Sequence, residues 1–348
     1  VFEETEAGFD PPRTPLEETL ARIWKEVLDI DRVGRQESFY DLGGHSLLAP
    51  RLFALIEERM GRRLPLATLL QASCVADMAE LLSREDWTPP WESLAPVQAE
   101  GSRPPFFCVH PAGGDILVYR DLSVLLGSDQ PFYGLQEALD FSGKGRNTID
   151  EMATHYVGQL RDFQPDGPYY LGGYSFGGVV AFEMARQLAA QGAEVRLLAL
   201  FDTNCPLLPP TDFKKKYEGL SLLAYLRSRP ASMVRAFHRL FILTLFHACR
   251  RLGRPFPRRF RLGGQFLFYR MARRRYKPGR YAGGMTLFRT TENKRQDDLG
   301  WSVLIDGPIE IRGVPGNHDN MFDPENVAAL AAEFRDCLLQ VQGAGNDG

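Results

Sequence analysis

Seven consecutive residues, Gly172 to Gly178, constrain most strongly what this chain can fold into. They read Gly-Gly-Tyr-Ser-Phe-Gly-Gly, follow the apolar run 169–171 and precede a helical pattern over 179–188. The apolar run predicts a buried strand. Glycines on both sides of Ser175 permit a sharp turn from strand to helix, which lifts the hydroxyl above a sheet. This pattern predicts a serine nucleophile. A phosphate-binding loop is the competing interpretation, but the segment contains neither Gly-x-x-x-x-Gly-Lys nor Gly-x-Gly-x-x-Gly.

From residue 104 onward, apolar runs alternate with helical patterns. Further strands are predicted over 106–109, 132–135, 195–201, 285–288 and 309–311. Further helices are predicted over 152–160 and 327–339. Continuous apolar strands that alternate with helices indicate a mostly parallel sheet covered on both faces. Residues 206–283 interrupt the alternation with helical patterns, and an insertion of this size is either a lid or a decoration.

A smaller helical unit precedes this sheet. Residues 86–103 carry prolines and no hydrophobic period, so they predict a semi-extended linker between two domains, 14–85 and 104–342. Thr14 and Pro15 form a helix start signal, and apolar residues then recur at helical spacing as far as Leu28. Two further helices are predicted, over 47–60 and 75–82. A unit of about 70 residues suffices for a small helical bundle.

Charge and cysteine content exclude several classes of protein. The 348 residues include 41 Lys or Arg and 44 Asp or Glu, a net charge of −3, and this balance argues against nucleic-acid binding. Five scattered cysteines without a Cys-x-x-Cys pair argue against a disulfide framework and a metal site. The acidic first residues do not resemble a signal peptide. The longest apolar stretch, 240–249, is about half a membrane span. We therefore expect a soluble cytoplasmic protein without a membrane span.

A second serine stands out in the helical unit. The residues around it read Asp41-Leu-Gly-Gly-His45-Ser46-Leu, just before the second predicted helix. A helix N-terminus can bind a phosphate group, although capping the helix is the most common role of a serine there. This string, in a small acidic bundle, resembles the peptidyl carrier domains of nonribosomal peptide synthetases over residues 14–85. The resemblance implies that Ser46 carries a covalent 4′-phosphopantetheine, attached by a phosphopantetheinyl transferase. Asp41 and His45 either help recognition by that enzyme or cap the loop.

A nucleophilic serine needs a general base and an acid that orients the base. The expected chain order in this fold is Ser, acid, His. Of six histidines, His318 lies in the loop between the last predicted strand and the last helix, where the base is expected. Asp202 directly follows the strand 195–201, where a carboxylate is better fixed than in a loop. Later carboxylates are alternatives for the acid: Glu292, Asp297, Asp298 and Asp306.

The oxyanion of a tetrahedral intermediate needs two backbone N–H donors. The first is expected from Phe176, directly after the nucleophile. The second is expected from the loop after strand 106–109, which reads His-Pro-Ala-Gly-Gly. Pro111 has no N–H to donate, so Ala112 is the preferred donor and Gly113 the second choice.

Residues 104–342 resemble the type I thioesterase domains of peptide and polyketide synthases. The resemblance rests on four segments, residues 109–114, 173–178, 201–203 and 316–318. It implies an α/β-hydrolase domain with its acid at the position of Asp202 and a helical lid at 206–283. The expected architecture is a small helical bundle followed by an α/β-hydrolase domain with a long helical lid insertion.

The two resemblances together imply chain release from an assembly-line synthetase. Upstream modules of the same synthetase would deliver an acyl or peptidyl chain as a thioester on the Ser46 arm. The chain would pass to Ser175 and leave by hydrolysis or macrocyclisation. The alternatives are a stand-alone serine esterase or lipase with a helical appendage, and a non-catalytic interaction module. A terminal reductase would need a nucleotide-binding glycine fingerprint, which the sequence lacks.

Residues 250–280 form an unusually basic segment of the predicted lid, with twelve Lys or Arg and no Asp or Glu. Such a run is most simply a solvated surface. The carrier unit 14–85 contains 12 acidic and 9 basic residues, so the segment could instead attract the carrier electrostatically.

Overall fold

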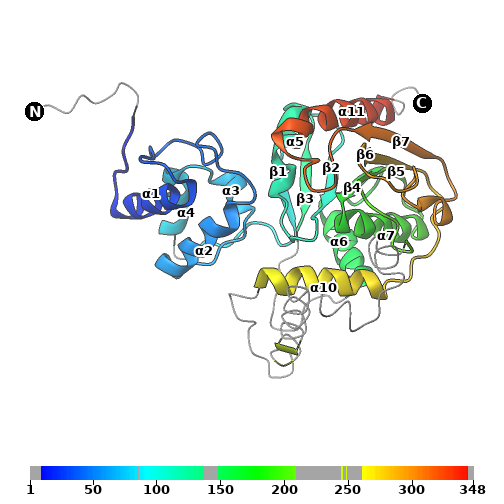
Figure 1. The fold of residues 1–348 in the computed structure, drawn as a ribbon, viewed down its shortest axis with the longest axis horizontal. Coiled ribbons are helices and arrows are strands. Elements are labelled where there is room, and N and C mark those ends of the chain that lie inside the picture. Colours follow the sequence, from blue (N-terminus) through cyan, green and yellow to red (C-terminus); the bar gives the residue numbers. More distant parts are fainter. Residues whose placement is uncertain are drawn as a thin grey trace, which may run out of the picture.

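The computed structural model describes residues 9–84, 86–136, 148–208, 244, 245, 248 and 261–343, with the backbone alone over 261–267. Figure 1 shows two units side by side, a helical one in blue and a sheet-based one in cyan to red. This arrangement confirms the expected fold class, a helical bundle followed by a mostly parallel sheet with helices.

The helical unit contains α1 (Pro15–Leu28), α2 (Ala49–Met60), α3 (Thr68–Gln71) and α4 (Val75–Ser83). Thr14 caps α1, because its hydroxyl accepts a hydrogen bond from the Glu17 N–H at 3.1 Å. The core of the unit is apolar and includes Trp24, Phe39 and Ile56, each 0% exposed. The short α3 was not predicted from the sequence, since four residues are too few to establish a helical period.

The sheet of the second unit has seven strands in the order β1-β3-β2-β4-β5-β6-β7. Their bounds are β1 Leu94–Gln98, β2 Phe106–Val109, β3 Phe132–Leu135, β4 Tyr169–Tyr174, β5 Val195–Phe201, β6 Met285–Thr290 and β7 Ile309–Val314. All neighbouring pairs are parallel except β1 with β3. The carboxyl ends of β2, β4, β5 and β6 therefore meet at one edge of the sheet.

Helices cover both faces of the sheet (Figure 1). One face carries α5 (Arg120–Leu126), which follows the short η1 (Leu117–Tyr119), and α11 (Pro324–Gly343). The other face carries α6 (Ile149–Phe163) and α7 (Phe176–Ala190). A further short turn, η3 (Trp301–Val303), lies between β6 and β7.

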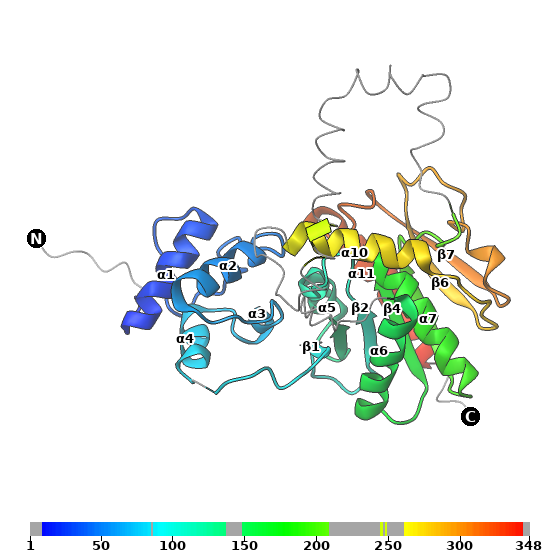
Figure 2. The ribbon, with the colours of Figure 1, turned by 90° about the horizontal axis from the view of Figure 1, so that it is seen from below.

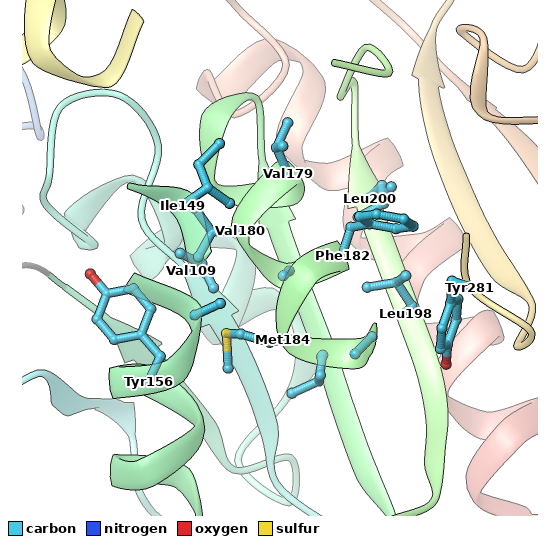
Figure 3. Packing of buried hydrophobic residues seen from close by; sticks show 14 of the residues in the cluster. Val109, Ile149, Tyr156, Val179, Val180, Phe182, Met184, Leu198, Leu200 and Tyr281 are labelled. Atoms are coloured by element: carbon cyan, nitrogen blue, oxygen red, sulfur yellow. The ribbon is translucent and has the colours of Figure 1, made fainter. Parts of the chain in front are cut away.

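Buried apolar side chains join α6 and α7 to the strands. Figure 3 shows Tyr156 of α6, Met184 of α7, Val109 of β2 and Leu198 of β5 packed in one cluster. The cluster also contains Trp301, which is 0% exposed. This packing holds the amino end of α7 against the sheet, where the functional serine lies.

The predicted linker differs from the structure at one point. Residues 94–98, inside the predicted linker 86–103, form β1 and pair antiparallel with β3. The sequence does not predict this strand, because Pro96 breaks the apolar pattern. Proline within a strand is tolerated at a sheet edge such as this one.

Much of the predicted lid lies outside the described residues, including most of the helical pattern over 206–260. The described part contains the helix α10 (Arg261–Arg275). Tyr269 and Ala272 of α10 are buried in the same cluster as α6 and α7, and Figure 2 shows α10 alongside these helices.

Two basic residues of the segment 250–280, Arg273 and Arg280, have partners within the sheet unit. Arg273 donates to the carbonyls of Asn204 and Cys205 at 3.0 and 3.5 Å, and Arg280 forms an ion pair with Asp306. At least these two side chains serve local structure.

The two units contact each other through the segment after β2. Leu117 of η1 is 3% exposed and belongs to the core cluster of the helical unit. Conversely, Ala67 of the helical unit is buried in a core cluster of the sheet unit, the one that contains Ile116. The Arg120 guanidinium lies 3.8 Å from the centre of the Tyr40 ring.

The described cysteines, Cys74, Cys108, Cys205 and Cys337, are buried and free. The described residues contain no group of His, Cys, Asp and Glu that could hold a metal ion. Among the helices that the structure describes, none combines the length and the apolar character needed to cross a membrane.

Candidate active site

Ser175 occupies a strained turn between β4 and α7. Its φ of 56° lies in the left-handed region, which a non-glycine residue adopts only when its surroundings impose it. Its N–H donates to the Phe201 carbonyl at 3.1 Å, which ties the turn to β5. The turn needs glycine nearby, because a Cβ at Gly177 would overlap the carbonyl oxygens of Val109 and His110. The sequence pattern around Ser175 therefore reflects steric necessity.

Three predicted residues from distant parts of the chain meet at this turn. The Ser175 Oγ lies 2.9 Å from the His318 Nε2. The His318 Nδ1 lies 2.8 Å from the Asp202 Oδ2. Because a carboxylate only accepts hydrogen bonds, Nδ1 carries the proton and Nε2 is free to accept the serine proton. This geometry can support a serine nucleophile at Ser175, with His318 as its base and Asp202 orienting the base.

Asp202 is fully buried, and its second oxygen is also satisfied. Oδ1 accepts hydrogen bonds from the Thr290 N–H, the Thr290 hydroxyl and the Asn293 amide at 3.1, 2.9 and 3.2 Å. Burial by itself would raise the pKa of Asp202, but the hydrogen bonds from His318, Thr290 and Asn293 outweigh burial and hold the pKa below its ordinary value. The carboxyl therefore stays ionised beside His318.

The alternative acids contact other groups. Glu292 accepts from the Asn317 side chain at 3.2 Å, and Asp297 lies 3.5 Å from the Arg289 guanidinium. Asp298 accepts from the Gly300 and Ser302 N–H groups at 2.9 Å each. Asp306 pairs with Arg280. Asp202 alone among the five predicted candidates contacts His318.

The two expected oxyanion donors are the backbone N–H groups of Phe176 and Ala112. Phe176 is the first residue of α7, and Ala112 follows Pro111 in the loop after β2. Neither N–H donates a hydrogen bond to any residue that the structure describes. Free N–H groups of this kind can receive an oxyanion. Gly113 stays the second choice beside Ala112.

His318 is held on its own loop. The Tyr174 hydroxyl donates to the His318 carbonyl, and the two rings lie 5.1 Å apart between centroids. The His318 side chain is 40% exposed, whereas Asp202 is 0% exposed. The base is thus accessible on one side and anchored on the other.

Ser46 lies in the helical unit, in the turn 46–48 that leads into α2. It does not cap the helix, because the residue before α2 is Leu48, which makes no side-chain cap. The hydroxyl of Ser46 donates no hydrogen bond within the described part of the chain. Its neighbour Leu47 is 81% exposed. Asp41 and His45 are also exposed, and Ser46 between His45 and Leu47 is half-buried.

The glycines before Ser46 have a steric reason as well. Gly43 has a φ of +88°, and a Cβ at Gly44 would overlap the buried Phe39 ring. The Gly44 N–H donates to the Phe39 carbonyl at 2.8 Å. The loop can therefore turn tightly just before Ser46.

The residues that support the predicted site residues were not predicted from the sequence. Thr290 and Asn293 hold Asp202, and Tyr174 holds the loop of His318. Thr290 ends the strand beside β5, so a polar residue at that edge was the available signal. Asn293 and Tyr174 gave no signal that separates them from ordinary loop and strand residues.

Family models match both units. The thioesterase domain family matches residues 104–338, and the phosphopantetheine attachment site family matches residues 18–82. The first match alone covers more than half of the chain.

Two curated relatives cover nearly all of the chain. It is 36% identical over 341 residues to malpinin synthetase of Mortierella alpina, covering 95% of this chain and 4% of that protein. It is 35% identical over 331 residues to a dimodular nonribosomal peptide synthase of Bacillus subtilis, covering 92% of this chain and 14% of that protein. The chain therefore spans only a small part of the length of these relatives.

Solved structures agree with this assignment. A four-domain nonribosomal peptide synthetase in its holo form aligns over 97% of this chain and 27% of its own, with 26% identity and a TM-score of 0.58. The NocB thioesterase domain, in covalent complex with a fluorophosphonate nocardicin G analog, aligns over 68% of this chain and 96% of its own, with 29% identity and a TM-score of 0.51. The chain belongs to the thioesterase domain family and joins that domain to a preceding phosphopantetheine-attachment domain, the pairing found in nonribosomal peptide synthetases.

Proposed function

We propose that this chain releases a finished acyl or peptidyl chain from a nonribosomal peptide synthetase by way of an ester on Ser175. The observation that carries the proposal is the continuous hydrogen-bonded series Ser175–His318–Asp202, at 2.9 and 2.8 Å. Its place on the same polypeptide as a carrier domain supports a substrate delivered within the chain. The domains are proposed to span 14–85 and 104–342.

The first half-reaction moves the acyl group onto the enzyme. His318 Nε2 takes the proton of Ser175 as the hydroxyl oxygen attacks the thioester carbonyl carbon. The N–H groups of Phe176 and Ala112 stabilise the negative oxygen that forms. The carbon–sulfur bond then breaks, and the leaving thiolate receives the proton from His318. Asp202 stabilises the imidazolium that exists between these steps.

The second half-reaction frees the product. His318 takes a proton from water, or from an amine or hydroxyl within the acyl chain, and that nucleophile attacks the Ser175 ester. The bond to Ser175 breaks and the serine regains its proton. Water yields an acid, whereas an internal nucleophile yields a ring.

Ser46 is the proposed attachment residue for 4′-phosphopantetheine. The residues present fit such a group, because the half-buried serine lies in a turn between the exposed residues His45 and Leu47, and its hydroxyl has no partner among the described residues. The bound arm would supply the thiol that holds the acyl chain. Upstream modules of the synthetase and a phosphopantetheinyl transferase are the proposed partners, and a cytoplasmic location follows from that setting.

The proposal is tested by intact-protein mass. Ser46 is loaded with acyl-pantetheine by a transferase and an acyl coenzyme A, in the wild type and in Ser175→Ala. We expect the wild type to lose the acyl group over time and Ser175→Ala to retain it. The mass of the released product separates an acid from a ring.

Two outcomes would contradict the proposal. If the wild type gains no more mass on loading than Ser46→Ala does, Ser46 carries no pantetheine arm. The carrier role then fails, and a serine esterase with a helical appendage is favoured. If a serine-directed fluorophosphonate does not label Ser175, the unit is a non-catalytic module.

A further inference from the structure

His110 is a second histidine beside the active site, and it cannot be the base. It is 0% exposed and lies at the end of β2, directly before the loop that supplies the Ala112 donor. Its ring packs against two aromatic rings, with centroids 6.2 Å from Phe176 and 5.3 Å from Tyr269. Burial lowers the pKa of His110 to about 4, so the ring is neutral at ordinary pH.

Both ring nitrogens of His110 have partners, and these partners determine the tautomer. Nδ1 lies 2.7 Å from the Pro111 carbonyl oxygen, which can only accept. Nδ1 therefore carries the proton. Nε2 lies 3.0 Å from the Tyr156 hydroxyl of α6 and accepts from it. The imidazole thus links α6 to the backbone of the loop.

The Pro111 carbonyl belongs to the same peptide unit as the Ala112 N–H. A peptide unit is planar and trans, so its C=O and N–H point in opposite directions. A hydrogen bond that fixes the carbonyl also fixes the N–H. The Gly114 N–H donates to the same carbonyl at 3.0 Å, which closes the turn from the other side.

We infer that His110 is a positioning residue that aims the Ala112 N–H at the oxyanion through its hydrogen bond to the Pro111 carbonyl. The inference rests on the proposed function and deepens it. His110 does not touch the reacting atoms. Its effect passes through one rigid peptide plane, from the carbonyl that it holds to the N–H on the other side.

A matched pair of amide variants tests the inference. In His110→Asn the side-chain amide can take the place of Nδ1 and donate to the Pro111 carbonyl. In His110→Gln the amide takes the place of Nε2, so it can meet Tyr156 but not the carbonyl. Tyr156→Phe removes only the hydroxyl that meets Nε2. The substrate is p-nitrophenyl acetate, a small ester that passes through the same oxyanion, used with the full chain.

We expect His110→Gln to lower kcat about ten- to a hundredfold with little change in KM, because an oxyanion donor acts in the transition state. His110→Asn restores kcat to within about threefold of the wild type, and Tyr156→Phe loses less than His110→Gln. The pH profile of kcat keeps its shape in all variants, since His110 does not titrate in the working range. Binding of phenylboronic acid, which places an oxygen in the oxyanion site, weakens in parallel with kcat.

The inference is overturned if His110→Gln keeps the kcat of the wild type, or if His110→Asn loses as much as His110→Gln. It is also overturned if Tyr156→Phe loses as much, because the pocket as a whole would then matter rather than the carbonyl bond. A failure of the proposed function is distinguishable, since in that case Ser175→Ala would release nitrophenolate as fast as the wild type.

Discussion

At the scale of single residues, the site depends on a carboxylate whose two oxygens have separate tasks. One oxygen of Asp202 orients His318, and the other is occupied by Thr290 and Asn293. A fully buried carboxylate without such partners would cost several kcal/mol or take up a proton. The hydrogen bonds therefore keep the charge where the imidazolium needs it.

Asp202→Asn should lower kcat by about 10³- to 10⁴-fold, because the amide removes the charge and disturbs the tautomer of His318. The check is steady-state turnover of p-nitrophenyl acetate by the full chain. Asp298→Asn is the matched control, because Asp298 is an alternative acid whose carboxylate accepts from the Gly300 and Ser302 N–H groups rather than from His318. Equal losses in the two variants would contradict the assignment of the acid.

At the scale of elements, β4 and α7 together fix the position of the turn at Ser175. The amino end of α7 lies directly on the backbone of β2, because Gly177 has no side chain to hold the two apart. This close approach places the amino end of α7 beside the start of the loop that contains Ala112. The proposed oxyanion site depends on how this helix packs on the strand.

Gly177→Ala should destabilise the sheet domain by about 1–3 kcal/mol, as overpacking does, and should reduce kcat by displacing Ser175. Thermal unfolding and turnover of p-nitrophenyl acetate measure the two effects. Gly158→Ala in α6 is the control, since nothing lies within 4 Å of a Cβ there. We expect that variant to be neutral or slightly more stable. A harmless Gly177→Ala would show that α7 does not lie as close to β2 as described.

At the scale of the whole molecule, the carrier unit lies against the segment that follows the oxyanion loop. Leu117 enters the carrier core cluster, and Arg120 faces Tyr40, which lies six residues before Ser46. The contact joins the carrier unit to the part of the chain that directly follows the loop of Ala112.

Arg120→Gln should slow transfer from loaded Ser46 to Ser175 about two- to tenfold, because a cation–π contact contributes about 0.5–2 kcal/mol. Hydrolysis of free p-nitrophenyl acetate should not change. Intact-mass time courses of the acyl-loaded chain measure the first rate. Arg196→Gln is the control, because Arg196 lies at the amino end of β5 and pairs with Glu194 at 2.8 Å. A uniform loss on both substrates would argue that Arg120 supports the fold rather than the contact.

The sequence by itself determined the features that depend on residues close together in the chain. Ser175 and Ser46 each stand in strings whose glycines are needed sterically within a few residues, so their local patterns were readable. His318 followed from chain order and from its place between a strand and a helix. The strands were readable because buried parallel strands are continuously apolar.

Only the tertiary structure decided which groups meet across the chain. Thr290 and Asn293 lie 88 and 91 residues from Asp202, and Tyr156 lies 46 residues from His110. No local pattern in the sequence predicts these contacts, because the parallel order of β2, β4, β5 and β6 creates them. The same holds for β1 inside the predicted linker, where pairing with β3 overrides a proline-rich sequence. The residues proposed as catalytic could be selected from the sequence because their residue types and motifs are distinctive. The residues that support them are ordinary in type, and only long-range packing shows which groups they contact.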